Sequence, residues 1–170
     1  GCMEEVVVNE ALGWGDPGFS TAAYATSLAC APLITGGTDE QKELFLRRVS
    51  EQGSLASYAI TEPGAGSDTR TVRDGDEWVL TGSKTFTTNG VYGNLYFVSA
   101  RTGTEGPRHR QLSQFLVERD SVGLSVARKL DKTGMLSSDT AELVFDAVRD
   151  GLTTMWRVIA YVGKEVRGRP

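Results

Sequence analysis

Histidine and cysteine are scarce in this 170-residue chain, and their scarcity excludes several kinds of site. His109 is the only histidine, so no metal site can be built around it, and a Ser–His–Asp triad is hard to place. It lies between Arg108 and Arg110, a basic trio that is either able to meet phosphates or part of a solvated loop. Cys2 and Cys30 are too few and too far apart for a disulfide framework, so a reducing compartment is expected.

Basic charge and long apolar runs are also missing, and this limits the classes of partner. The formal net charge is −4, which gives no basic footprint for nucleic acid. No apolar run approaches the roughly 20 residues of a membrane-spanning helix. The chain shows no signal or transit peptide and begins at Gly1, which suggests a fragment. We therefore expect the bacterial cytoplasm as the compartment, with the mitochondrial matrix as the alternative.

Glycine is plentiful, with 20 residues against 5 prolines, and it separates three helical patterns before residue 54. Residues 3–15 have apolar side chains near helical spacing. Residues 19–37 are rich in alanine, and we expect Pro32 to interrupt that helix. In residues 38–53, Thr38 and Gln41 stand at the positions of a capping box, which predicts the start of a third helix.

After residue 54 the pattern changes to short β-type runs separated by glycine, aspartate and asparagine. Asp74 and Gly75 occupy the place of a tight hairpin turn. Several strands in succession without helices predict an antiparallel sandwich or barrel, so the whole chain is assigned to the α+β class. The runs are 55–61, 77–81, 83–89, 94–100, 113–118, 123–127 and 141–146.

Two stretches carry candidate chemistry, and the first is YAITEPGAGSD at 58–68. Gly64 and Gly66 let the backbone approach a ligand, and Ser67 adds a hydroxyl. A pyrophosphate or the edge of a flat polar ring would suit such a surface. The alternative is a solvent-exposed turn, in which Glu62 and Asp68 only support the turn geometry. The stretch is neither a Walker loop nor a GxGxxG fingerprint.

The second stretch is SKTFTTNG at 83–90. Its threonines surround one aromatic residue, Phe86, so a strand here could offer hydroxyls on one face and a ring on the other. The alternative is a β-branched strand that ends in an Asn89–Gly90 turn without a binding role.

Taken in order, YAITEPGAGSD, WVLTGSKTFTTNG and FLVERDSVGLSVARKLDKTGMLSSDTAELVFDAVR resemble the middle β domain of the acyl-CoA dehydrogenases. LACAPLITGGTDEQKELFL is similar to the end of that family's N-terminal helical domain. The resemblance divides the chain into a partial helical domain (1–54), a middle β domain (55–149) and a divergent tail (150–170). The family's C-terminal helical bundle would then be absent from this sequence.

The resemblance implies FAD as the cofactor and an acyl-CoA as the substrate. It places Tyr58, Ile60 and Thr61 at the isoalloxazine edge, and Gly66 and Ser67 at the diphosphate, with Ser67 also near the acyl-CoA path. In the second stretch it implies that Phe86, where the family usually has tryptophan, shields one ring face. Thr87 would lie beside it, and Thr88 would offer its hydroxyl to the reactive ring nitrogen.

The resemblance also implies a reaction in which hydride leaves the β carbon of the thioester for the flavin. The base, a glutamate, would lie in the C-terminal helical domain, so no catalytic residue is assigned here. An electron-transfer flavoprotein would accept the electrons, and the full-length form would be a homo-oligomer. Segment 69–77 is shorter than is usual in the family, so an edge or register change is expected there. The alternatives are a non-catalytic flavin- or acyl-CoA-binding module and a truncated product that aggregates.

Overall fold

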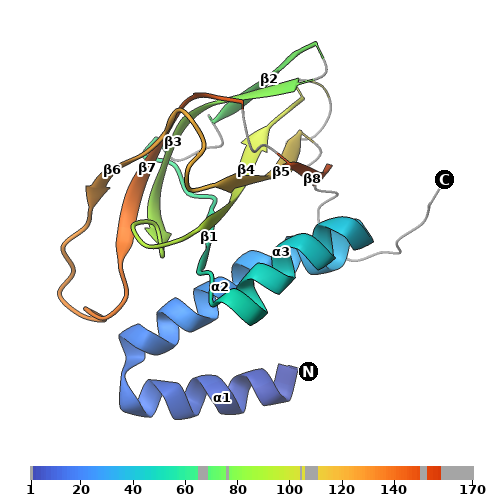
Figure 1. The fold of residues 1–170 in the computed structure, drawn as a ribbon. Coiled ribbons are helices and arrows are strands. Elements are labelled where there is room, and N and C mark those ends of the chain that lie inside the picture. Colours follow the sequence, from blue (N-terminus) through green and yellow to red (C-terminus); the bar gives the residue numbers. More distant parts are fainter. Residues whose placement is uncertain are drawn as a thin grey trace.

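The computed structural model describes residues 2–64, 69–75, 77–103, 105, 111–149 and 153–157. Three helices come first and are followed by a curled mixed sheet, so the predicted α+β order is confirmed (Figure 1). Helix α2 lies between α1 and the sheet (Figure 1). The elements are α1 (Cys2–Gly15), α2 (Pro17–Gly36), α3 (Asp39–Gln52), β1 (Ala56–Ala59), β2 (Arg70–Asp74), β3 (Glu77–Thr88), β4 (Leu95–Arg101), β5 (Leu112–Glu118), β6 (Leu124–Lys129), β7 (Thr140–Val148) and β8 (Thr153–Arg157).

The start of α3 confirms the predicted capping box. The Gln41 amide donates to the Thr38 hydroxyl at 3.2 Å, and the Thr38 amide donates to Gln41 Oε1 at 2.9 Å. Each bond satisfies a backbone donor that the first helical turn leaves without an intrahelical partner. The helix ends at Gly53, whose φ of 66° suits a residue without a Cβ.

The expected interruption at Pro32 is wrong, because α2 continues through it to Gly36. A proline inside a helix removes one backbone hydrogen bond and crowds the preceding turn. Here the helix also buries Ala29, Cys30 and Leu33 against the sheet. Pro32 is only about one turn from the end of α2, so the stabilisation from this burial outweighs the loss of one backbone hydrogen bond.

The sheet is mostly antiparallel, with two parallel pairings that the sequence pattern did not predict. Its strands follow the order β6-β7-β3-β2-β4-β5-β8. The two parallel pairings are those of β1 and β2 with β4. Two parallel neighbours need a long connection between them. Between β1 and β4, that connection contains the β2–β3 hairpin. The hairpin turns at Gly75, with φ of 62°, which confirms the predicted Asp74–Gly75 turn.

The strands test the expectations for runs 77–81 and 83–89 and for segment 69–77. The runs at 77–81 and 83–89 belong to one strand, β3. In segment 69–77, β2 pairs with β3 in uninterrupted register, so there is no register change. Only Arg70 pairs with β4, and beyond it the described residues of β2 pair with β3 alone, which agrees with the expected edge. In the divergent tail, residues 153–157 form β8, whose backbone pairs with β5. The pairing edge of β5 selects the strand, and this tertiary contact is invisible in the tail's own sequence.

The core lies on both faces of the sheet, because β4 alternates between two apolar clusters. Tyr96, Val98 and Ala100 point into the first, and Leu95 and Phe97 point into the second, which is covered by the helices. A strand buried on both faces explains the continuous apolar run of β4. Among the residues that the structure describes, no helix has the length and apolar character needed to cross a membrane.

Candidate functional site

The two candidate stretches, far apart in sequence, lie side by side in the fold. The Thr85 amide donates to the Thr61 carbonyl at 2.8 Å. The Lys84 ammonium donates to the Ile60 carbonyl at 3.0 Å. The chain that leaves β1 is therefore fixed to the middle of β3, as a shared site would require.

A β-bulge shapes β3 where it meets that chain. Lys84 pairs with Leu143 and Thr87 pairs with Ala141, so two residues of β3 stand opposite Glu142 alone. One of the two is Phe86, whose φ of 55° is unusual for any residue other than glycine. A bulge of this kind redirects a side chain that regular pairing would place elsewhere.

The bulge leaves the Phe86 side chain 67% exposed. Ile60, on the neighbouring chain, is 46% exposed, and the side chain of Thr61 is exposed as well. An aromatic ring, an aliphatic side chain and a hydroxyl are thus presented to solvent from adjacent backbone segments. A flat ligand with an apolar face and a polar edge could use all three.

Beneath this surface, Lys84 and Glu62 form an ion pair that is buried from solvent. The Lys84 Nζ and Glu62 Oε1 atoms are 2.6 Å apart, and the side chains are 0% and 3% exposed. Burial lowers the pKa of Lys84, and the neighbouring Glu62 carboxylate acts against that shift. Glu62 also accepts a hydrogen bond from the Thr69 amide at 2.9 Å, across the glycine loop. This bond supports the interpretation that Glu62 stabilises the turn.

Tyr58 and Thr87 do not present their side chains at the same surface. Tyr58 packs against the helix-side core, and its hydroxyl accepts a hydrogen bond from Gln114 at 3.2 Å. Burial raises the pKa of Tyr58. The Thr87 side chain is 1% exposed, and its hydroxyl has no partner in the described part of the chain. Contacts of these two residues with a ligand would therefore come from the backbone.

Thr88 is half-buried at the end of β3, where it pairs with Thr140. Gly66, Ser67 and Asp68 lie outside the described residues, and so does the basic trio 108–110. The structure thus brings Ile60, Thr61 and Phe86 together and does not describe the part predicted to hold the diphosphate.

The predicted Asn89–Gly90 turn is present, and Asn89 does more than end the strand. Its φ is 59°, and its amide group donates to the carbonyls of Ala22 and Ala56 at 2.9 and 3.1 Å. Asn89 therefore fastens α2 and β1 to the end of β3. The turn interpretation and the binding interpretation of this stretch are compatible.

Sequence reasoning missed the roles of Lys84 and Asn89. A lysine among threonines in a strand, close to an acid that follows another strand, is a weak signal for a buried pair. For Asn89, the asparagine–glycine pattern points only to the turn, because its contacts with α2 depend on how the helices dock.

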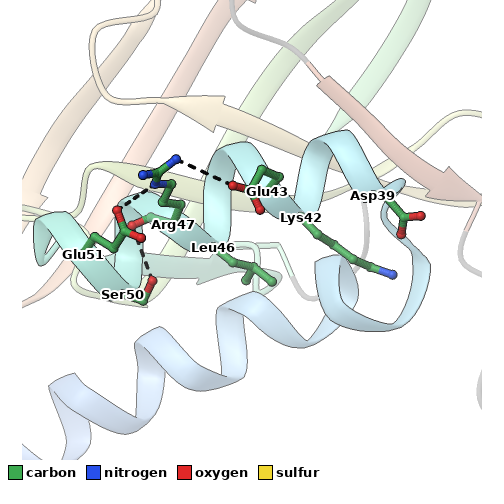
Figure 2. A pocket seen from close by; sticks show the side chains of 7 residues that line it. All are labelled: Asp39, Lys42, Glu43, Leu46, Arg47, Ser50 and Glu51. Atoms are coloured by element: carbon green, nitrogen blue, oxygen red, sulfur yellow. Dashed lines mark hydrogen bonds and ion pairs between the residues drawn. The ribbon is translucent and has the colours of Figure 1, made fainter.

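A shallow hollow elsewhere does not belong to this site. All seven lining residues are on α3, and Figure 2 shows Arg47 reaching Glu43 and Glu51. These ion pairs measure 3.7 and 2.7 Å between exposed side chains. The pattern is that of a solvated helix face with i,i+4 pairs.

Comparison with known proteins shows which family this chain resembles. Residues 57–148 match the family model for the acyl-CoA dehydrogenase middle domain, and residues 1–52 match that for the N-terminal domain. Isobutyryl-CoA dehydrogenase, mitochondrial, of Dictyostelium discoideum is 36% identical over 98% of this chain and 39% of its own.

Solved structures agree with the sequence matches. Butyryl-CoA dehydrogenase of Megasphaera elsdenii superimposes with a TM-score of 0.75 at 33% identity, over 84% of this chain and 39% of its own. A glutaryl-CoA dehydrogenase of Mycobacterium smegmatis, in complex with FADH2, gives 0.73 at 30% identity, over 85% and 38%. The chain spans between 32% and 39% of the length of the curated relatives it matches. Because its helical region and its β region match the family's N-terminal and middle domains in that order, the chain belongs to the acyl-CoA dehydrogenase family.

Proposed function

We propose that this chain supplies the flavin-facing surface of an FAD-dependent acyl-CoA dehydrogenase, which forms an α,β double bond in an acyl-CoA thioester. The observation that carries the proposal is the meeting of Ile60 and Thr61 with the bulge at Phe86. Family membership supports the reaction class, and the FADH2 bound to the M. smegmatis relative supports the cofactor.

The described residues fit a flavin. Phe86 offers an exposed ring that can cover one face of a flat heterocycle. Thr61, which is exposed, and Thr88, which is half-buried, each add a hydroxyl. Tyr58, Thr87 and the glycine loop contribute backbone groups, and we assign Gly66 and Ser67 to the diphosphate. The buried Thr87 hydroxyl, which has no partner in the described part of the chain, takes no direct role in this assignment.

Each residue has a defined task in the reaction. A bound flavin would supply the acceptor for the hydride that leaves the β carbon. Hydrogen-bond donors beside the ring, including Thr88, would stabilise negative charge on a reduced flavin. Phe86 would exclude water from one face of the ring, and we assign Ser67 to the path of the acyl-CoA. We assign no proton-abstracting base to the described residues.

The partners follow from the same proposal. Electrons would pass to an electron-transfer flavoprotein, and the longer family form would be a homo-oligomer. The compartment is the bacterial cytoplasm or the mitochondrial matrix. The competing function is a non-catalytic module that binds flavin or acyl-CoA without turnover, and the two differ in whether substrate reduces the bound flavin.

The test begins with a visible absorbance spectrum of the purified chain after incubation with FAD and desalting. We expect a retained flavin band in the wild type and in Trp14→Ala, a control that removes an 86% exposed aromatic side chain from α1. Phe86→Ala should weaken flavin binding by about fivefold, the loss of one aromatic contact. A colourless wild-type protein would overturn the proposal. A band that acyl-CoA substrates never bleach would favour the non-catalytic module.

A further inference from the structure

The Lys84–Glu62 pair connects three parts of the candidate site at one buried point. Lys84 donates to the Ile60 carbonyl just before the glycine loop. Glu62 accepts from the Thr69 amide just after that loop. Lys84 itself directly precedes the bulge that carries Phe86. The Ile60 carbonyl, the Thr69 amide and the start of the bulge are therefore linked through the same two side chains.

Stability alone does not explain a pair of this kind. Removing two charges from water is costly, and apolar residues of similar volume often stabilise a fold equally well. The Arg48 Nη1 and Glu118 Oε2 atoms are 2.8 Å apart, but the two side chains are 26% and 42% exposed, so that pair keeps much of its hydration. The buried pair offers what an apolar pair lacks, namely directed bonds to a chosen carbonyl and a chosen amide.

We infer that Lys84 and Glu62 are positioning residues that hold the chain at Ile60 and Thr61 in place beside the Phe86 bulge, so that both contact the same flavin. The inference rests on the proposed function. Neither side chain would touch the cofactor, because both are buried beneath the exposed surface. They act through Ile60, Thr69 and Phe86, and the directionality of their hydrogen bonds is the property that matters.

Glu62→Leu/Lys84→Met in the full chain separates positioning from stability, since it replaces the pair by apolar side chains of similar length. We expect a melting temperature close to that of the wild type and a flavin dissociation constant raised about tenfold or more. Glu62→Gln/Lys84→Met keeps a carbonyl oxygen for the Thr69 amide and should recover part of the affinity. Arg48→Met/Glu118→Leu is the matched control and should bind flavin like the wild type. Wild-type affinity in Glu62→Leu/Lys84→Met would overturn the inference.

A second readout needs no flavin and distinguishes this inference from the proposed function. Hydrogen exchange at the Thr69 and Thr85 amides reports the loop end and the bulge directly. In Glu62→Leu/Lys84→Met we expect exchange at both amides to accelerate about tenfold, while the Leu143 amide in the core stays protected. If the wild type binds no flavin, the proposed function fails and these rates decide alone. Unchanged rates at Thr69 and Thr85, or equal acceleration at Leu143, would show that the pair does not position these two segments. This readout also serves if the apolar variant is too unstable to compare by flavin affinity.

Discussion

Phe86 illustrates how a single residue can carry strain for the sake of a surface. Its backbone has φ of 55°, a conformation that costs roughly 1–2 kcal/mol for a residue with a Cβ. Its ring gains little from packing in return, because the side chain is 67% exposed. The strain is therefore not offset locally, and contact with a ligand is the physical compensation we expect.

Phe86→Gly should accordingly raise the free energy of unfolding by about 1 kcal/mol, because glycine tolerates the positive φ. The same change should weaken flavin binding through loss of the ring. Phe86→Ala is the control, since it removes the ring and keeps the unfavourable conformation. Urea unfolding of the three proteins gives the comparison. A glycine variant no more stable than the alanine variant would mean that the backbone is not strained.

Cys30 gives a pH-dependent prediction at the same scale. Burial raises the pKa of its thiol above the value of 9.0 expected for an unfolded chain. The folded state therefore favours the protonated thiol, and this contribution to stability is present below pH 9.0 and decreases as the pH rises towards the folded pKa. The stability advantage of the wild type over Cys30→Ala should shrink between about pH 8 and about pH 10. A constant difference in urea unfolding across that range would contradict it.

Among the elements, α3 depends on its first turn, because its sequence is mostly polar and only Phe45 is buried. The capping box supplies two hydrogen bonds where the helix has none of its own. A helix with so little burial owes a larger share of its stability to its ends.

Thr38→Ala should lower the free energy of unfolding by about 1 kcal/mol, since it removes the acceptor for the Gln41 amide. Thr35→Ala is a matched control: that hydroxyl donates to the Ala31 carbonyl inside α2, and alanine is the better helix former. Denaturant unfolding followed by circular dichroism measures both. Equal effects of the two substitutions would show that the cap contributes nothing specific.

The helices and strands also show which features can be predicted from the sequence. Helix caps and the Gly75 turn were predictable because their causes are local. The bulge at Phe86 was not, since it arises from the pairing of β3 with β7, and β8 was missed because its partner is the distant β5. At the candidate site, the two stretches were identified from their residues and their resemblance to a family. The buried link through Lys84 was not, because it exists only once those stretches meet.

For the whole molecule, the main feature is an apolar helical surface that the fold leaves uncovered. Val6, Val7 and Val8 are 59%, 57% and 55% exposed, although three consecutive residues point to different sides of a helix. Trp14 on the same helix is 86% exposed. Helix α1 is thus solvated around most of its circumference, and its apolar groups favour association.

We expect the chain to self-associate as its concentration rises, and Val6→Glu/Val8→Lys to reduce this association. Val72→Glu/Val122→Lys is the control, because those valines are 65% and 76% exposed but lie at separate places in the β region. Static light scattering over a concentration series measures the effect. Equal reductions by both variants would show that net polarity, and not the α1 surface, governs association.

The position of β3 between β2 and β7 has a consequence for how the protein is made. Its hairpin partner β2 is synthesised just before it, but β7 emerges only after residues 89–139 have been added. During that interval one edge of β3 is open on the nascent chain, and an open strand edge invites pairing with other chains. The Phe86 bulge forms only when β7 arrives. The backbone that we expect to face the flavin therefore acquires its shape late in synthesis, after the two ends of α3 and the β2–β3 hairpin are complete.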